Sequence, residues 1–296
     1  MPPRKERQID RRAIGRVSRL QLRARQAVEG YYSGIHKSPY HGFNVEFAEY
    51  REYAPGDDPR YVDWRVLART DRFFIKQFEA ETNLSCYVLL DASGSMEFTS
   101  EPETRLDYGA ALAASLSLLM LRQGDQAGLV VFDHAVRQFI PPRGNARHFG
   151  AIIEALERVQ AGSDTNIGAV LHEIAERVRR RSLVIVISDL LDDVDTLLNG
   201  LQHFRHRRHE VIVLHLLDDA EIEFPFDRVT LFEGMERGEQ VVVDPRVVAE
   251  SYRTRFRTYL ERLRRGCTEK NIDYQRLQLS EPFDRALTAY LGRRAK

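Results

Sequence analysis

Four nearly continuous apolar runs mark the middle of the chain: CYVLLD from Cys86, AGLVVF from Ala127, SLVIVISD from Ser182 and EVIVLHLLD from Glu210. Runs that do not alternate with polar residues are typical of strands that are covered on both faces. The segments between them repeat apolar residues every three or four positions, which is the spacing of amphipathic helices. Strand and helix therefore alternate, and the pattern predicts a doubly wound α/β domain with a mostly parallel sheet.

The segments on either side of this core have a different pattern. Short alternating runs occupy residues 36–82, and RVTLFEGMERGEQVVVDP, from Arg228, predicts two strands joined by a glycine-containing turn. We expect residues 36–82 to pair with residues 222–245 in a small antiparallel β layer. A basic helical segment would then span residues 1–35, and residues 83–296 would form the α/β domain with the 222–245 β insertion inside it.

Three further elements are predicted after the insertion. A long amphipathic helix starts near Val247, DYQRLQL from Asp273 predicts an edge strand, and PFDRALTAYLGRR from Pro282 predicts a closing helix. The edge strand would extend the same sheet, so the chain ends as part of the α/β domain.

Composition narrows the class of protein. The 296 residues are 43% hydrophobic and 30% charged, which fits a soluble globular protein. Basic and acidic residues both number 44, and no nucleic-acid motif occurs, so no nucleic acid is expected as a partner. Two distant cysteines, Cys86 and Cys267, argue against a disulfide or zinc scaffold. Without an apolar run of about 18 residues or a signal peptide, we expect a cytoplasmic protein.

The N-terminus is strongly basic, because its first 25 residues hold nine Arg or Lys against two acids. Five apolar residues lie near helical spacing, which predicts an amphipathic helix: Ile9, Val17, Leu20, Ala24 and Val28. Docking on its own fold or on a partner is favoured, and peripheral contact with an anionic membrane is the alternative.

Polar side chains follow two of the predicted strands. Asp91 ends the first apolar run and is followed by Ser93 and Ser95, Asp189 ends the third run, and Thr165 precedes a predicted helix. Ligands of doubly wound sheets bind beyond the carboxyl ends of the strands, where the strand order reverses. If the order is 3-2-1-4-5, the first and third runs are neighbours at that point. Purely oxygen donors suit Mg²⁺, with Mn²⁺ and Ca²⁺ as alternatives.

Two other interpretations of the strand tip remain open. Asp91, Ser93 and Ser95 taken alone also fit a polar turn with local capping. A metal-dependent hydrolase or phosphatase that uses Asp91 and Ser93 is the alternative function. Haloacid dehalogenase-like phosphatases carry a second aspartate where this chain has Ser93, and the nucleophile-elbow and P-loop strings are absent. We therefore expect an interaction protein and not an enzyme.

A cluster of histidines lies in HFRHRRHE, which contains His203, His206 and His209. Successive steps of three residues advance about 300° around a helix, so these imidazoles would point in different directions. Neighbouring arginines would also oppose cation binding. We interpret the stretch as a solvated basic helix end.

DASGSM, with Thr165 and Asp189, resembles the metal-ion-dependent adhesion site of von Willebrand factor A-type domains. That pattern, D-x-S-x-S followed by a threonine and an aspartate, is matched at all five positions. The resemblance implies a cation held by these residues, with an open position that accepts a carboxylate from another protein.

A wider resemblance covers about residues 30–293. EFAEYREYAPGDDPRYVDWRVLARTDRFFIKQFEAE from Glu46, FPFDRVTLFEGMERGEQVVVDP from Phe224 and EPFDRALTAYL from Glu281 are similar to the bacterial domain-of-unknown-function family 58. Members commonly accompany MoxR-type AAA+ ATPases. The resemblance implies an adaptor or co-chaperone-like partner of such an ATPase, or of its client.

Overall fold

The computed structural model describes residues 18–37, 50–52, 74–76, 84–162, 166–235, 239–283 and 285. The chain divides into two units, Ile35–Asn83 and the remainder. In the smaller unit, the described strands β1 (Tyr50–Glu52) and β2 (Phe74–Lys76) pair antiparallel.

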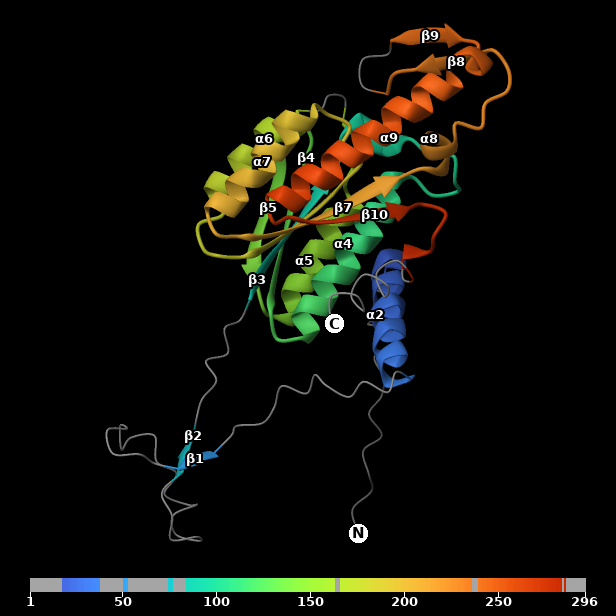
Figure 1. Cartoon of the computed structure of the whole chain (residues 1–296). Coiled ribbons are helices and arrows are strands. Elements are labelled where there is room, and N and C mark those ends of the chain that lie inside the picture. Colours follow the sequence, from blue (N-terminus) through green and yellow to red (C-terminus); the bar gives the residue numbers. More distant parts are fainter. Residues whose placement is uncertain are drawn as a thin grey trace, which may run out of the picture. The chain divides into compact units, whose positions relative to one another are not determined.

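A six-stranded sheet forms the centre of the larger unit, in the order β10-β7-β6-β3-β4-β5 (Figure 1). Its strands are β3 (Ser85–Asp91), β4 (Gln126–Phe132), β5 (Val136–Arg143), β6 (Leu183–Ser188), β7 (Glu210–Leu217) and β10 (Asp273–Gln278). Only the edge strand β5 runs antiparallel to its neighbour. Counted from β3, the order is 3-2-1-4-5-6, so β3 and β6 are neighbours where the order reverses. The predicted doubly wound class with a mostly parallel sheet is confirmed.

Helices cover both faces of the sheet (Figure 1). One face packs against α2 (Arg19–Lys37), α4 (Arg105–Arg122) and α5 (Ala146–Glu157), and the other against α6 (Ile167–Arg177), α7 (Val194–His206) and α9 (Pro245–Glu269). Each face has its own hydrophobic core, the first under α2, α4 and α5 and the second under α6, α7 and α9. Consecutive strand residues point to opposite faces, so Leu90 lies in the first core and Leu89 in the second. No helix of the described residues has the length and apolar character needed to cross a membrane.

Side-chain caps fix where four of these helices begin. The N-cap oxygen accepts a hydrogen bond from the backbone N–H three residues later at Thr104, Asn145, Asn166 and Asp193. Such a cap satisfies one of the N–H groups that the first helical turn leaves without a partner. Two of these caps, Asn166 and Asp193, start helices beside the carboxyl ends of β3 and β6, so they help to define the sheet edge.

The basic N-terminal segment docks on the fold through α2. Ala24 and Val28 are fully buried in the first core, and Ala27 lies between them. Arg23 forms two contacts with Glu103, at 2.5 and 2.9 Å. Of the two favoured alternatives, docking on its own fold and docking on a partner, the structure shows the first for this helix. Residues 1–17 lie outside the described part of the chain.

The β insertion forms a hairpin of β8 (Thr230–Glu233) and β9 (Gln240–Val243), preceded by the short helix α8 (Asp219–Glu223). The two predicted strands are thus present. Their expected pairing with residues 36–82 falls largely on residues outside the described part and stays a prediction. The same holds for the closing helix predicted from Pro282, since the described chain ends with residues 283 and 285.

A glycine allows α6 and α7 to approach closely. A Cβ atom at Gly200 would lie 2.8 Å from the Gly168 carbonyl oxygen and 3.0 Å from Leu171 Cβ. We expect Gly200→Ala to lower the free energy of unfolding by about 1–3 kcal/mol, because the two helices must separate. Urea denaturation measures the effect.

The matched control for this change is Gly150→Ala in α5, where an added Cβ meets no atom within 4 Å. This substitution should leave stability unchanged or raise it by up to about 1 kcal/mol, because alanine favours the helix. A loss of equal size in both variants would show that helix spacing is not the cause.

Candidate metal centre

The carboxyl ends of β3 and β6 meet through a hydrogen bond between their last residues. Ser188 Oγ donates to Asp91 Oδ2 at 2.6 Å, and Ser93 N donates to Asp91 Oδ1 at 2.9 Å. Asp189 follows Ser188 directly, and all four residues are at most 1% exposed. The two aspartates, about a hundred residues apart in the sequence, therefore lie at one buried point of the sheet edge.

Two serine hydroxyls face each other in the turn after β3. Ser93 precedes the short 3₁₀ helix η2 (Gly94–Glu97), and Ser95 lies within it. Their Oγ atoms are 3.1 Å apart, and both residues are buried. The turn thus places a pair of neutral hydroxyl oxygens beside the Asp91 carboxylate, as the D-x-S-x-S spacing predicts.

Thr165, the fifth predicted position, lies outside the described residues. The chain before it reaches the site, because Gly162 N donates to the Ala92 carbonyl oxygen at 2.7 Å. After it, Asn166 caps α6. A role for Thr165 stays a prediction, and the structure brings the other four predicted residues to the same edge.

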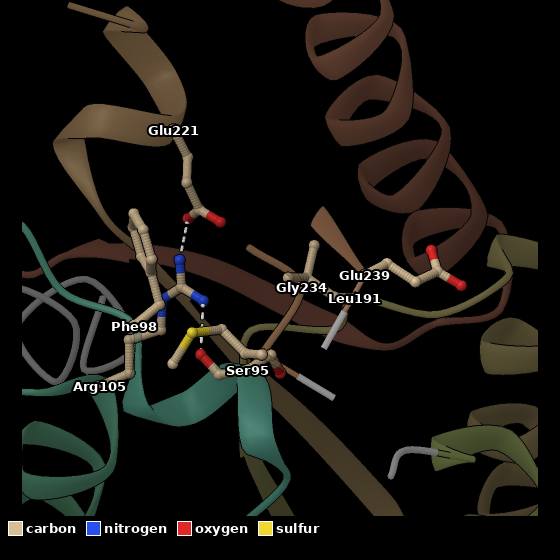
Figure 2. Close-up of a pocket in the computed structure, with 8 residues that line it drawn as sticks. Ser95, Phe98, Arg105, Leu191, Glu221, Gly234 and Glu239 are labelled. Carbon is tan, nitrogen blue, oxygen red and sulfur yellow. Dashed lines mark hydrogen bonds and ion pairs between the residues drawn. The ribbon is translucent and has the colours of Figure 1, made fainter. Parts of the chain in front are cut away.

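A buried arginine completes this edge, and sequence reasoning missed it (Figure 2). Arg105 is 1% exposed, and its NH1 donates to Asp189 Oδ2 at 2.8 Å and to the Ser95 carbonyl oxygen at 3.1 Å. Its NH2 lies 2.5 Å from Glu221 Oε2. One signal was available in the sequence. Arginine at the first position of a helix opposes the helix dipole, and so needs acidic partners from elsewhere.

The buried position of Asp91 disfavours its ionised form. Burial, and then the charge of Asp189, raises its pKa to about 7, although hydrogen bonds from Ser188 and Ser93 favour the charged form. Within the described part of the chain, no basic side chain lies within ion-pair distance of Asp91, whereas Asp189 has Arg105. A positive charge placed beside Asp91 would therefore be stabilised.

These donors fit a hard divalent cation. Serine hydroxyls and aspartate carboxylates are the oxygen ligands that Mg²⁺, Mn²⁺ and Ca²⁺ take. Among the described residues, no group of three or more His, Cys, Asp or Glu is arranged to hold a metal ion. A cation at this edge would thus depend on the hydroxyl pair, with the carboxylates of Asp91 and Asp189 supplying charge around it.

The loop after Asp189 has an unusual backbone. Leu190 is fully buried with φ of 55°, a left-handed conformation that costs a non-glycine residue about 1–3 kcal/mol. Two hydrogen bonds hold it: Leu190 N donates to Ser188 Oγ at 2.9 Å, and the Tyr259 hydroxyl donates to the Leu190 carbonyl oxygen. Helix α9, which carries Tyr259, therefore fixes the shape of the sheet edge.

An open pocket of about 350 Å³ lies beside the site (Figure 2). Its lining combines the site with the insertion: Ser95, Phe98, Arg105, Leu191, Glu221, Gly234, Met235 and Glu239. In Figure 2, Ser95 and Arg105 lie on one side, and Gly234 and Glu239 lie on the other. The chain that leads from β8 towards β9 thus forms a wall of the pocket.

The three histidines of HFRHRRHE contact different groups, which confirms that they do not converge. His203 Nδ1 lies 2.9 Å from His172 Nδ1, and His206 Nε2 lies 3.1 Å from Gln202 Nε2. The interpretation as a wholly solvated end was wrong for His209. That residue is 1% exposed, and its Nδ1 accepts a hydrogen bond from Ser182 N, because it packs where β7 starts beside β6.

The chain is similar to two bacterial proteins in sequence and to a third in structure. An uncharacterized protein of Mycobacterium tuberculosis, Rv1480, is 27% identical over 257 residues, which cover 84% of this chain and 80% of the relative. YeaD of Bacillus subtilis is 24% identical over 160 residues, 53% of this chain and 38% of the relative. Among solved structures, the conserved hypothetical protein BatB of Bacteroides thetaiotaomicron has a TM-score of 0.48 and 16% identity, covering 72% of this chain and 98% of that chain.

The family assignment rests on a match that covers more than half of the chain. Residues 49–265 match the protein family described as "Protein of unknown function DUF58". That range contains the six-stranded sheet up to β7, the insertion and most of α9, so it includes the candidate metal centre. The resemblance noted from the sequence is confirmed, and the chain belongs to the DUF58 family.

Proposed function

We propose that this protein is a non-enzymatic adaptor that binds a divalent cation, Mg²⁺ in the first place, and uses it to hold an acidic residue of a partner protein. The observation that carries the proposal is the buried hydroxyl pair, Ser93 and Ser95 with their Oγ atoms 3.1 Å apart, between two strand ends that each carry an aspartate. A von Willebrand factor A-like sheet supports a protein-interaction role.

Each residue of the site has a distinct part in this proposal. Ser93 and Ser95 would supply hydroxyl oxygens, with Thr165 as a third. Asp91 already accepts hydrogen bonds from Ser93 N and Ser188 Oγ, so it orients the turn and adds negative charge. Arg105 holds Asp189 in place. Bound Mg²⁺ would supply positive charge that neutral hydroxyls do not cancel, which leaves it able to attract a carboxylate.

The proposed partner is a MoxR-type AAA+ ATPase or the client of one. Membership in the DUF58 family supports this, because the resemblance to that family implies a partnership with such an ATPase. The chain has only two cysteines, which are far apart in the sequence and lack metal-binding spacing, and this fits a reducing compartment, so we propose a cytoplasmic adaptor. A cation-bridged carboxylate contact is reversible, as a transient assembly requires.

Calorimetric titration with Mg²⁺ tests the site. Asp91→Asn keeps the size of the side chain but removes its charge, and we expect it to weaken Mg²⁺ binding by about 10–100-fold. Ser93→Ala should have a similar effect, because it removes one of the two hydroxyls. Asp195→Ala is the control, since that carboxylate is exposed and pairs with Arg262 on the surface.

Thermal unfolding in the absence of metal shows that each variant is folded before the titration. Equal Mg²⁺ affinity in wild type, Asp91→Asn and Ser93→Ala would reject the metal centre. A comparable loss of affinity in Asp195→Ala would show that the effect is general electrostatic attraction, and would reject it as well.

A further inference from the structure

Exposed apolar side chains gather around the β8–β9 hairpin. Six of the nine exposed large hydrophobic residues in the described part of the chain fall between residues 229 and 247: Val229, Leu231, Met235, Val241, Val242 and Val247. A seventh, Leu191, is 42% exposed next to the candidate metal centre. Soluble proteins rarely expose clustered apolar side chains without a binding role.

An aromatic groove of about 610 Å³ lies between this hairpin and α9. Phe224 stacks on Phe232 with ring centres 5.8 Å apart and lies 4.5 Å from Tyr252, which in turn stacks on Phe256 at 5.8 Å. The contacts fix these rings against one another, so the groove exists before any ligand arrives. Preformed apolar grooves of this size suit large side chains of a ligand.

The groove continues into the candidate metal centre. Leu191 lines both the groove and the pocket that contains Ser95 and Arg105. Tyr259, another lining residue, donates to the Leu190 carbonyl oxygen, so groove and site share one loop. A ligand that reaches the site can therefore place its neighbouring residues in the groove.

The charge of the groove favours an acidic ligand. Arg255 lines it and is exposed, and no carboxylate of the described residues lies within ion-pair distance of its guanidinium. In the adjoining pocket, Glu221 is paired with Arg105, and the Glu239 carboxylate points away from Ser95 (Figure 2). An exposed arginine among aromatic rings attracts an acidic group that is attached to apolar ones.

We infer that the groove and the metal centre form one docking surface for a partner segment that carries an acidic residue next to large apolar side chains. The position of the acidic residue at the cation rests on the proposed function. The apolar side chains would occupy the aromatic groove, and a further acidic group would face Arg255.

Selection from a random peptide library, panned on the wild-type protein in Mg²⁺, tests the inference. Enriched peptides should contain Asp or Glu within a few positions of two large apolar residues. Their affinity is measured by fluorescence anisotropy. Arg255→Glu and Val248→Asp, both in the groove wall, should weaken binding at least about tenfold, because each removes a complementary contact.

The matched control is Arg257→Glu. It makes the same charge change on α9 but two residues further on, about 200° around the helix. Arg257→Glu should keep wild-type affinity, and melting temperatures confirm that all variants are folded. Wild-type affinity in both Arg255→Glu and Val248→Asp would overturn the inference that the groove binds the partner segment. Enriched peptides without the acidic and apolar combination, or no enrichment at all, would overturn it too.

Two further arms separate the possible outcomes. Loss of peptide binding with chelator or in Asp91→Asn, but not in the groove variants, would support the metal centre alone and reject the groove. Loss in the groove variants with indifference to chelator would reject the metal centre while keeping the groove. Self-association in sedimentation that disappears in Val248→Asp would assign the groove to a second copy of the chain. Binding to phosphatidylglycerol vesicles that disappears in the same variant would assign it to a lipid surface. Either result would overturn the inference of an acidic, apolar partner segment.

Discussion

Replacement of Arg105 by methionine should lower the free energy of unfolding by about 3–5 kcal/mol. The guanidinium is 1% exposed and lies between two carboxylates, at 2.8 Å from Asp189 and 2.5 Å from Glu221. Methionine fills similar space but leaves two carboxylates without their counter-charge, the buried Asp189 and Glu221, whose side chain is 14% exposed. Removing one partner of a buried pair costs far more than the intact pair contributes.

The control for Arg105 lies on the same helix. Arg122, in the last turn of α4, is half-exposed and lies 3.5 Å from Glu29, so Arg122→Met should change stability by less than about 1 kcal/mol. Urea denaturation at neutral pH compares the two variants. A loss below about 1 kcal/mol in Arg105→Met would mean that hydration or protonation of Asp189 and Glu221 replaces the ion pairs at little cost. The arginine would then not be a structural part of the site.

The strand order explains why the candidate metal centre could be predicted from the sequence. Asp91 and Asp189 each end a continuous apolar run, and the alternation of strands and helices restricts the sheet to a few arrangements. In the observed order, β3 and β6 are direct neighbours, so the two aspartates lie at adjacent strand ends. The spacing of Ser93 and Ser95 then fixes their place in the turn. Periodicity and strand position were sufficient to predict that these four residues lie at the same edge of the sheet.

Arg105 could not be predicted in the same way. Its position depends on where the start of α4 lies relative to the end of β6, and on α8, which brings Glu221 from more than a hundred residues away. Hydrophobic patterns report which residues are apolar, but they do not show which charged residue is buried. The aromatic groove was missed for a related reason: Phe224, Tyr252 and Phe256 look like ordinary core residues until the hairpin is placed beside α9.

The stabilisation of the protein by Mg²⁺ should increase as the pH rises. Burial and the charge of Asp189 raise the pKa of Asp91 from 3.8 to about 7 in the folded protein. The folded protein therefore keeps a proton that the unfolded chain has lost between these two values. Without metal, the stability contributed by protonated Asp91 is complete below pH about 4. It falls as the pH rises towards about 7, by at most about 1.4 kcal/mol per pH unit.

Mg²⁺ bound at the proposed site should reverse this dependence, because it would favour the ionised carboxylate of Asp91. Below the pKa of Asp91, binding must release the proton, so affinity should fall by up to about tenfold for each pH unit. The increase in melting temperature on adding Mg²⁺ should then be small near pH 5.5 and reach its maximum above pH about 7. Thermal denaturation across this range, with and without Mg²⁺, measures both effects.

Asp91→Asn separates this mechanism from general effects of pH. Asparagine keeps the acceptor oxygen for Ser93 N but has no proton to release, so the variant should lose the Asp91-dependent fall in stability between about pH 4 and 7 as well as the response to Mg²⁺. An equal Mg²⁺ effect at both ends of the pH range in the wild type would mean that the cation binds away from Asp91. The same pH slope in both proteins would mean that other groups cause it. The combined loss in one near-isosteric variant would connect the buried carboxylate, its proton and the cation at a single position on the sheet edge.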